Sequence, residues 1–318
     1  MAIVTLIAGL ILLVLAGDAL VRGAVSVAQR ASVPPIIIGL TIVAFGTSAP
    51  ELIVSVEAAL KRAPGLAIGN VVGSNITNIL LVLGLPAIIT PIVLAEDGIR
   101  RSTVFMILIS LGLAFMAMNG IISRLDGLFL IALLVVYLGY SGFEANKANR
   151  ANVVSDELEE LSADNITTKQ IALLLGFGVV GLGFGGKMVT EGALDLAAML
   201  GVADTAVGLT IVALGTSLPE LATSLAAALR KQTGVVIGNV LGSNIFNALG
   251  IIGITSLLVP LDVSSSIINF DIWVMLAAAL LMAPVAFMTR RVSRFGGVIM
   301  LLAYIIYTIV VFRNGMAI

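Results

Sequence analysis

The chain has 318 residues, of which 59% are hydrophobic and only 11% are charged. An average soluble domain carries about 25% charged residues, so this composition excludes a soluble globular protein. The sequence contains no cysteine and no histidine, which excludes disulfides, thiolate metal sites and histidine-based acid–base chemistry. Its 17 basic residues balance 18 acidic ones, so no basic surface for nucleic acid is expected. The composition indicates an integral membrane protein.

Long apolar stretches follow one another along the chain. A membrane-spanning helix needs about 20 apolar residues, and stretches of this kind predict ten spanning helices. They lie near residues 2–21, 34–60, 65–89, 102–119, 126–143, 171–196, 205–229, 234–259, 271–289 and 296–312. The first stretch lacks a basic leading segment and contains Asp18, so we expect a retained helix and not a signal peptide. The predicted fold class is an all-α polytopic membrane protein.

The sequence is duplicated. Residues 39–55 read GLTIVAFGTSAPELIVS and residues 208–224 read GLTIVALGTSLPELATS, identical at 13 of 17 positions. Residues 69–84 match residues 238–253 at 10 of 16 positions. In both matches the second copy follows the first by the same number of residues. The chain therefore divides into two repeats of five helices. Because five is odd, the second repeat enters the membrane from the opposite side, which makes an inverted-topology repeat. The predicted parts are a first repeat, a linker and a second repeat, at residues 1–145, 146–169 and 170–318.

The distribution of lysine and arginine predicts the orientation in the membrane. If the N-terminus lies outside, most basic residues fall on the cytoplasmic side, although Lys61 and Arg62 do not. We therefore expect both termini outside and the linker in the cytoplasm, in the inner (plasma) membrane of a prokaryotic cell. The acidic run at 156–164 is interpreted as a solvated connector, because it lacks the ligand spacing of an EF-hand calcium loop.

Each copy of the first repeated segment places a glutamate in the middle of an apolar span. A carboxylate at this depth costs about 3 kcal/mol, so Glu51 and Glu220 are expected to face the protein interior. Pro50 and Pro219 directly precede them and should kink or open the helix, which frees backbone carbonyls beside the carboxylates. Two hydroxyls before each proline share the helix face of its glutamate. They belong to Thr47, Ser48, Thr216 and Ser217.

Each copy of the second repeated segment carries polar residues spaced by four, which form a stripe on one helix face. The stripes consist of Asn70, Ser74 and Asn78 in the first repeat and Asn239, Ser243 and Asn247 in the second. Asn70 and Asn239 fit either an ion site or hydrogen bonds between helices, whereas Asn75 and Asn244 lie off the stripe and are interpreted as structural. Both segments offer only oxygen ligands, which suits calcium, sodium or magnesium and disfavours zinc, copper and nickel. Magnesium is the least suited of the three to a dry site, because it prefers to keep its waters.

The duplicated motifs resemble those of a known family. GTSAPE and GTSLPE, each followed by GNVVGSN or GNVLGSN, are similar to the two alpha-repeats of the cation/calcium exchanger superfamily, with the prokaryotic sodium/calcium exchangers as the most similar branch. The resemblance implies ten helices, an inverted repeat and alternating access at a central ion site. The calcium ligands that it implies are Glu51, Glu220 and the backbone carbonyls of Thr47 and Thr216. The flanking sodium ligands that it implies are the carbonyls of Ala44 and Ala213 and the hydroxyls of Ser48, Ser217, Ser74 and Ser243, with Asn78 and Asn247 lining the centre.

The expected function is secondary antiport of Na+ against Ca2+, electrogenic at three sodium ions per calcium ion. The transported ions and the lipid bilayer are the only partners expected, without a cofactor, an enzyme activity or an obligate protein partner. Potassium-dependent relatives carry aspartate where Asn247 stands, and calcium/proton exchangers carry a histidine that this chain lacks. Coupling to potassium and coupling to protons both stay open as alternatives. A cation channel that uses the same oxygen ligands is a further alternative. An intramembrane hydrolase is disfavoured, because Ser48 and Ser243 have no histidine or lysine in these segments to activate them.

The first helix of each repeat carries charges that change sign between the repeats. When the repeated segments are superposed, Asp18 and Arg22 align with Lys187 and Glu191. The flanking glycines are shared: Gly17 and Gly23 align with Gly186 and Gly192. The resemblance implies that these two helices slide over a more rigid core, which makes the charges part of a gate. The other interpretation is a pair of interfacial anchors that set the depth of each helix.

Overall fold

The computed structural model describes residues 2–31, 33–94, 98–150, 167–199 and 213–316. Over these ranges, eight helices are long and apolar enough to cross a membrane, and a ninth span results if a pair bent by 45° counts as one. The predicted span 205–229 begins outside the described residues, so only its second part is seen. The prediction of a helical, multi-pass membrane protein is confirmed.

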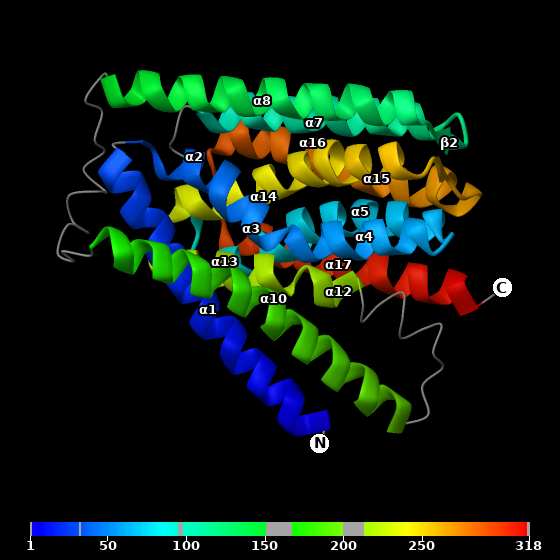
Figure 1. Cartoon of the computed structure of the whole chain (residues 1–318), viewed down its shortest axis with the longest axis horizontal. Helices are drawn as coiled ribbons and strands as arrows, with labels where there is room; N and C mark the ends of the chain where they lie inside the picture. The colour runs from blue at the N-terminus through cyan, green and yellow to red at the C-terminus, as the bar shows by residue number, and fades with distance from the viewer. Residues whose placement is uncertain (1, 32, 95–97, 151–166, 200–212, 317–318) are drawn as a thin grey trace.

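Along the chain, the two repeats contain similar but not identical series of helices (Figure 1). The first repeat consists of α1 (Ala2–Ala31), α2 (Pro35–Ile38), η1 (Gly39–Val43), α3 (Ala44–Thr47), α4 (Ala49–Leu60), α5 (Pro64–Thr77), η2 (Asn78–Val82), α6 (Gly84–Ile89), α7 (Gly98–Ala117) and α8 (Arg124–Arg150). The second consists of α10 (Thr168–Met199), α12 (Ala213–Thr216), α13 (Leu218–Leu229), α14 (Thr233–Phe246), η4 (Asn247–Ile251), α15 (Ile252–Leu258), η5 (Ile267–Asp271), α16 (Ile272–Pro284), η6 (Val285–Thr289) and α17 (Arg294–Met316). The η elements are π-helical segments. Because α8 reaches Arg150, only the two ends of the predicted linker 146–169 lie within the described part of the chain.

Two short β-ladders, which an all-α prediction does not include, join the repeats. Strand β1 (Ile92–Val93) pairs antiparallel with β4 (Arg291–Val292), and β2 (Ile121–Ile122) pairs with β3 (Leu261–Asp262). Each ladder combines one strand from each repeat. In every strand one residue is buried and its neighbour is exposed or half-exposed, so the loops at the helix ends are fixed to the core through one apolar side chain each.

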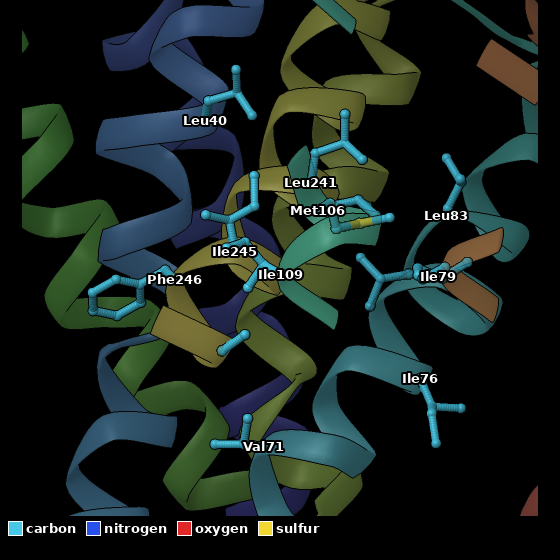
Figure 2. Close-up of a cluster of buried hydrophobic side chains, with 14 of the residues drawn as sticks. Leu40, Val71, Ile76, Ile79, Leu83, Met106, Ile109, Leu241, Ile245 and Phe246 are labelled. Atoms are coloured by element: carbon cyan, nitrogen blue, oxygen red, sulfur yellow. The ribbon is translucent and has the colours of Figure 1, made fainter. Parts of the chain in front are cut away.

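The second repeated segment of each half forms the centre of the molecule. The span Thr233–Leu258 is buried throughout its most apolar window, and Pro64–Ile89 is 78% buried, whereas Arg294–Val311 is only 11% buried. Around α14 the core consists of large apolar side chains such as Leu241, Ile245 and Met106 (Figure 2). The outer helices expose apolar side chains instead, which suits a surface in contact with lipid.

Helices α1 and α10 pack along each other and run obliquely to the remaining helices (Figure 1). Their contact depends on glycines at equivalent positions of the two repeats. A Cβ atom on Gly9 would lie 2.8 Å from the backbone of Val189, and one on Gly178 would lie 2.7 Å from Leu20. The absence of these side chains lets the two backbones approach closely, as is typical of small-residue crossings between membrane helices.

Candidate ion-binding site

A break in each first repeated segment positions its glutamate. Ser48 separates α3 from α4 with φ −84° and ψ 8°, and Ser217 precedes α13 with φ −87° and ψ 3°. The prolines that follow cannot donate a backbone hydrogen bond, so the predicted opening of the helix falls at these serines. Glu51 and Glu220 consequently lie in the first turns of α4 and α13, where the partial positive charge of a helix N-terminus stabilises a carboxylate.

Both glutamates are buried without a cationic partner. Glu51 is 1% exposed and Glu220 is 0% exposed, and the ion pairs seen among the described residues involve neither of them. Ser48 of the first repeat donates to Glu220 Oε1 at 2.9 Å. In the described part of the chain, the second oxygen of Glu220 and both oxygens of Glu51 have no hydrogen-bond partner. A buried carboxylate of this kind is stabilised either by an opposite charge or by a proton, and a site of oxygen ligands fits Ca2+ or Na+.

Two asparagines connect the repeats through hydrogen bonds. Asn70 Nδ2 donates to Ser55 at 3.0 Å and to the backbone carbonyl of Glu51 at 3.3 Å, while its Oδ1 accepts from Thr216 at 3.3 Å. Asn239 makes the equivalent contacts in the second repeat, to Ser224 at 3.1 Å and to the Glu220 carbonyl at 3.3 Å, and accepts from Thr47 at 3.2 Å. Of the two interpretations that the sequence allows for Asn70 and Asn239, the structure supports hydrogen bonds between helices.

The remaining hydroxyls and amides of the predicted site are buried in the same region. Ser217 donates to Ser74 at 3.4 Å, again across the repeats. Ser243 Oγ, Asn247 Oδ1 and both side-chain polar atoms of Asn78 are buried and lack partners among the described residues. The structure therefore offers neutral oxygens to a cation in addition to the carboxylates.

Local backbone geometry positions Asn78 and Asn247, the two asparagines that are expected to line the centre of the ion site. Asn78 and Asn247 begin the π-helical segments η2 and η4, and π-helical turns frequently occur at functional sites. Segment η2 contacts α13, which carries Glu220, and η4 contacts α4, which carries Glu51. Each asparagine thus lies on a turn that packs against the glutamate helix of the opposite repeat.

The two alanines of the predicted site start the short helices before the breaks. Ala44 is fully buried, and its carbonyl accepts from the backbone of Ser48 at 3.0 Å and from Thr47 Oγ1 at 3.3 Å. Ala213 is the first residue of α12, directly after the undescribed residues 200–212. Both therefore stand one turn before the break, next to the threonines and serines of the motif.

A cleft of about 630 Å³ leads from the surface toward this region. It lies between α3–α4 of the first repeat and α10, α12 and α13 of the second, and its walls include Pro50, Pro219 and Thr216. Lys187 and Glu191, two of the charges singled out in the sequence, also line it. They pair with each other at 3.7 Å on α10.

Sequence reasoning did not find the hydrogen bonds between amides and sulfurs behind the site. Asn75, which the sequence indicated as a structural residue, accepts a hydrogen bond from Asn247. Met106 and Met275 accept from Asn244 and Asn75. These methionines occupy equivalent positions of the two repeats, a signal that the aligned repeats already contain.

A multi-pass membrane protein that buries two carboxylates at duplicated helix breaks belongs to the class of membrane ion transporters. The family model of the sodium/calcium exchanger protein matches residues 1–143 and 170–313, so the chain belongs to that family. This confirms the resemblance to the prokaryotic branch of the cation/calcium exchangers that the motifs indicated.

Individual relatives cover nearly the whole chain. Sodium/calcium exchanger MaX1 of Methanosarcina acetivorans is 33% identical in an alignment 346 positions long, which covers 96% of this chain and 97% of that protein. Inner membrane protein YrbG of Escherichia coli (strain K12) is 35% identical over 295 residues, and the match covers 89% of this chain and 88% of that protein. A solved structure of the sodium-calcium exchanger NCX_Mj, soaked with zero Na+ and Ca2+, matches with a TM-score of 0.82 at 35% identity and covers 96% of this chain and 97% of that chain.

Proposed function

We propose that the protein exchanges Na+ for Ca2+ across the membrane by alternating access to one oxygen-lined site. The observation that carries the proposal is the pair of buried glutamates, Glu51 and Glu220, which form no ion pair and, apart from the hydrogen bond from Ser48 to Glu220, have no side-chain partner among the described residues. A purely structural role does not need two such carboxylates, because neutral polar groups hold membrane helices together at lower cost.

The proposed ligands follow the residue types at the two helix breaks. Glu51 and Glu220, with the carbonyls of Thr47 and Thr216, would hold Ca2+, which takes six to eight oxygens. Sodium ions would use the carbonyls of Ala44 and Ala213 and the hydroxyls of Ser48, Ser217, Ser74 and Ser243, with Asn78 and Asn247 at the centre. The names of MaX1 and NCX_Mj, which describe those proteins as sodium/calcium exchangers, support this choice of ions.

The proposed stoichiometry follows from the formal charge of the site. Two carboxylates balance one Ca2+, whereas three sodium ions exceed that charge by one. Exchange at three sodium ions per calcium ion therefore moves one net charge in each cycle, on which the membrane potential acts with about 2.3 kcal/mol per 100 mV. With sodium entering, an inside-negative potential drives calcium out of the cell.

The proposed architecture is ten helices in two inverted repeats, residues 1–145 and 170–318, with both termini outside and the linker 146–169 in the cytoplasm of a prokaryotic cell. Equivalent contacts of the two repeats support it: Asn70 and Asn239 bind the corresponding partners, and each β-ladder joins one repeat to the other. The resulting pseudo-twofold relation gives both membrane faces an equivalent route to the centre, which alternating access requires.

The test is calcium uptake into proteoliposomes under separately imposed sodium, potassium and proton gradients. Sodium-driven uptake that needs neither potassium nor a proton gradient is expected. A requirement for potassium or protons would favour the alternative coupling modes of the same superfamily instead. Ion currents far larger than an exchanger can carry would favour a channel.

A further inference from the structure

Asn75 is a buried asparagine that the proposed ion site does not use as a ligand. It is 2% exposed and lies on α5, one position after Ser74. Its Nδ2 donates to the backbone carbonyl of Asn244 at 3.4 Å and to Met275 Sδ at 3.9 Å. With the NH2 group held in this way, its Oδ1 is left for another donor, and it accepts from Asn247 Nδ2 at 3.1 Å.

This contact decides which end of the Asn247 amide is free. A carboxamide has one oxygen and one NH2 group, and its hydrogen bonds determine which way each points. Because the NH2 group of Asn247 is bound to Asn75, its Oδ1 is the free atom, buried and without a partner in the described chain. A hard cation takes the oxygen and is repelled by the NH2 group.

The position of Asn247 makes its free oxygen relevant to the ion site. Asn247 begins η4, and η4 contacts α4, the helix that carries Glu51. Both oxygens of Glu51 are buried and lack hydrogen-bond partners among the residues described. The free amide oxygen and the free carboxylate thus belong to two elements that pack directly against each other.

We propose that Asn75 is a positioning residue that holds the oxygen of Asn247 toward the cation, and in this way sets the affinity of the site. The inference rests on the proposed function, since it concerns the same ion site. Partners that orient a metal ligand commonly affect affinity by about 10- to 100-fold.

The second repeat supplies a natural comparison. Asn244, the counterpart of Asn75, donates to Met106 Sδ at 3.5 Å, but its Oδ1 has no partner in the described part of the chain. Asn78, the counterpart of Asn247, is likewise without a side-chain partner there. The two asparagines Asn75 and Asn244 are therefore equally buried, at 2% exposure each, but only Asn75 binds an asparagine of the centre.

The experiment measures calcium binding to the purified full-length protein with the variants Asn75→Ala, Asn247→Asp and their combination. In the protein that keeps Asn247, Asn75→Ala is expected to weaken calcium binding by about tenfold. In the Asn247→Asp background the same change should have almost no effect, because a carboxylate presents oxygen in either orientation. An equal loss in both backgrounds would overturn the orienting role.

Asn244→Ala is the matched control, because it removes the same amide from an equally buried position. Its thermal stability should fall no more than that of Asn75→Ala, because Asn244 makes fewer side-chain hydrogen bonds than Asn75, while its calcium affinity should stay close to that of the unmodified protein. Equal affinity losses in both alanine variants would overturn the proposal and indicate a packing effect. If the unmodified protein shows no sodium-driven calcium transport, the proposed function fails; if it does and Asn75→Ala binds calcium normally, only this inference fails.

Discussion

The two repeats share the contacts of Asn70 and Asn239 near the glutamates and differ in the contacts of their first helices. At the centre, Asn70 and Asn239 make equivalent hydrogen bonds of almost the same length, at 3.0 Å and 3.1 Å for the serine contact. At the edge, α1 is fixed to α13 by an ion pair between Asp18 and Arg230 at 2.5 Å. The hydrogen bonds of these two asparagines are therefore shared between the repeats, whereas the contacts of the first helices depend on residues that the repeats do not share.

The edge differs because the charges at equivalent positions differ. Asp18 corresponds to Lys187, and Arg230 corresponds to Lys61, so the same contact on the other side would bring two lysines together. Lys61 pairs with Glu57 on its own helix instead, and Lys187 pairs with Glu191.

The packing of the first helix of each repeat differs between the repeats in the same way as the charges do. A Cβ atom on Gly17 of α1 would lie 3.1 Å from the backbone of Ala222 on α13, so these helices are in close contact. The residue equivalent to Ala222 is Ile53 of α4, which lines the cleft next to α10. The described conformation is thus closed between α1 and α13 and open between α10 and α4. This favours the interpretation of the charged first helices as a gate.

The largest effect is expected from neutralising either glutamate. Two unit charges 4 Å apart interact by about 4 kcal/mol at an effective dielectric constant of 20, and Ca2+ carries two charges, so Glu51→Gln and Glu220→Gln should each weaken calcium binding by at least about a thousandfold. Sodium-driven calcium uptake in proteoliposomes should disappear in both variants. Glu57→Gln, an exposed change on the same helix as Glu51, is the control. Transport that persists in one of the two glutamine variants would show that the two glutamates do not contribute equally to the site.

The next effect concerns the coupling ion. Asn247→Asp adds one negative charge to the site without changing its shape, so an additional monovalent cation should accompany calcium. The charge moved per calcium ion and the dependence on potassium should change, as measured by calcium flux at clamped potentials with and without potassium. An unchanged dependence on sodium, potassium and pH would show that this position does not select the coupling ion.

A smaller effect is expected at the closed edge. The side chains of Asp18 and Arg230 are 41% and 39% exposed, so their ion pair contributes about 1 kcal/mol and its loss in Asp18→Asn shifts the access equilibrium by about fivefold. Because the chain has no cysteine, single cysteines at the equivalent positions Ile53 and Ala222 report each side. Asp18→Asn should increase thiol labelling at Ala222→Cys and decrease it at Ile53→Cys. Unchanged labelling would mean that the ion pair does not hold this side closed.

The smallest effect is expected from the intrahelical pair of Glu57 and Lys61. Both side chains are more than half exposed, at 58% and 71%, and solvent screens a pair of this kind so strongly that it contributes little to stability. Lys61→Gln should leave the calcium transport rate and the thermal midpoint almost unchanged. A large loss of transport would show that this pair takes part in gating and that the two edges are more alike than their charges indicate.

The sequence was sufficient to predict the duplicated helix breaks, because proline and glutamate in an apolar span have few structural explanations. It could not place the break at Ser48, since the proline only requires that the preceding turn opens. Neither the contact between Thr47 and Asn239 nor the ion pair of Asp18 follows from local pattern, because each depends on how helices far apart in the chain pack.

Element boundaries and short strands were also beyond the sequence. Helix α1 continues to Ala31, well past the apolar stretch 2–21 that predicted it, because arginines such as Arg22 and Arg30 end the apolar pattern but are good helix formers. The two-residue strands carry no periodic pattern, and their pairing becomes visible only when both repeats are folded together.

The central claim is that sodium and calcium occupy one site in turn, and equilibrium binding of radioactive calcium to the purified protein tests it most directly. Sodium should displace the bound calcium with a dependence steeper than one-to-one, whereas potassium should not, and Glu220→Gln should bind little calcium at any sodium concentration. Calcium that stays bound at saturating sodium would contradict the account.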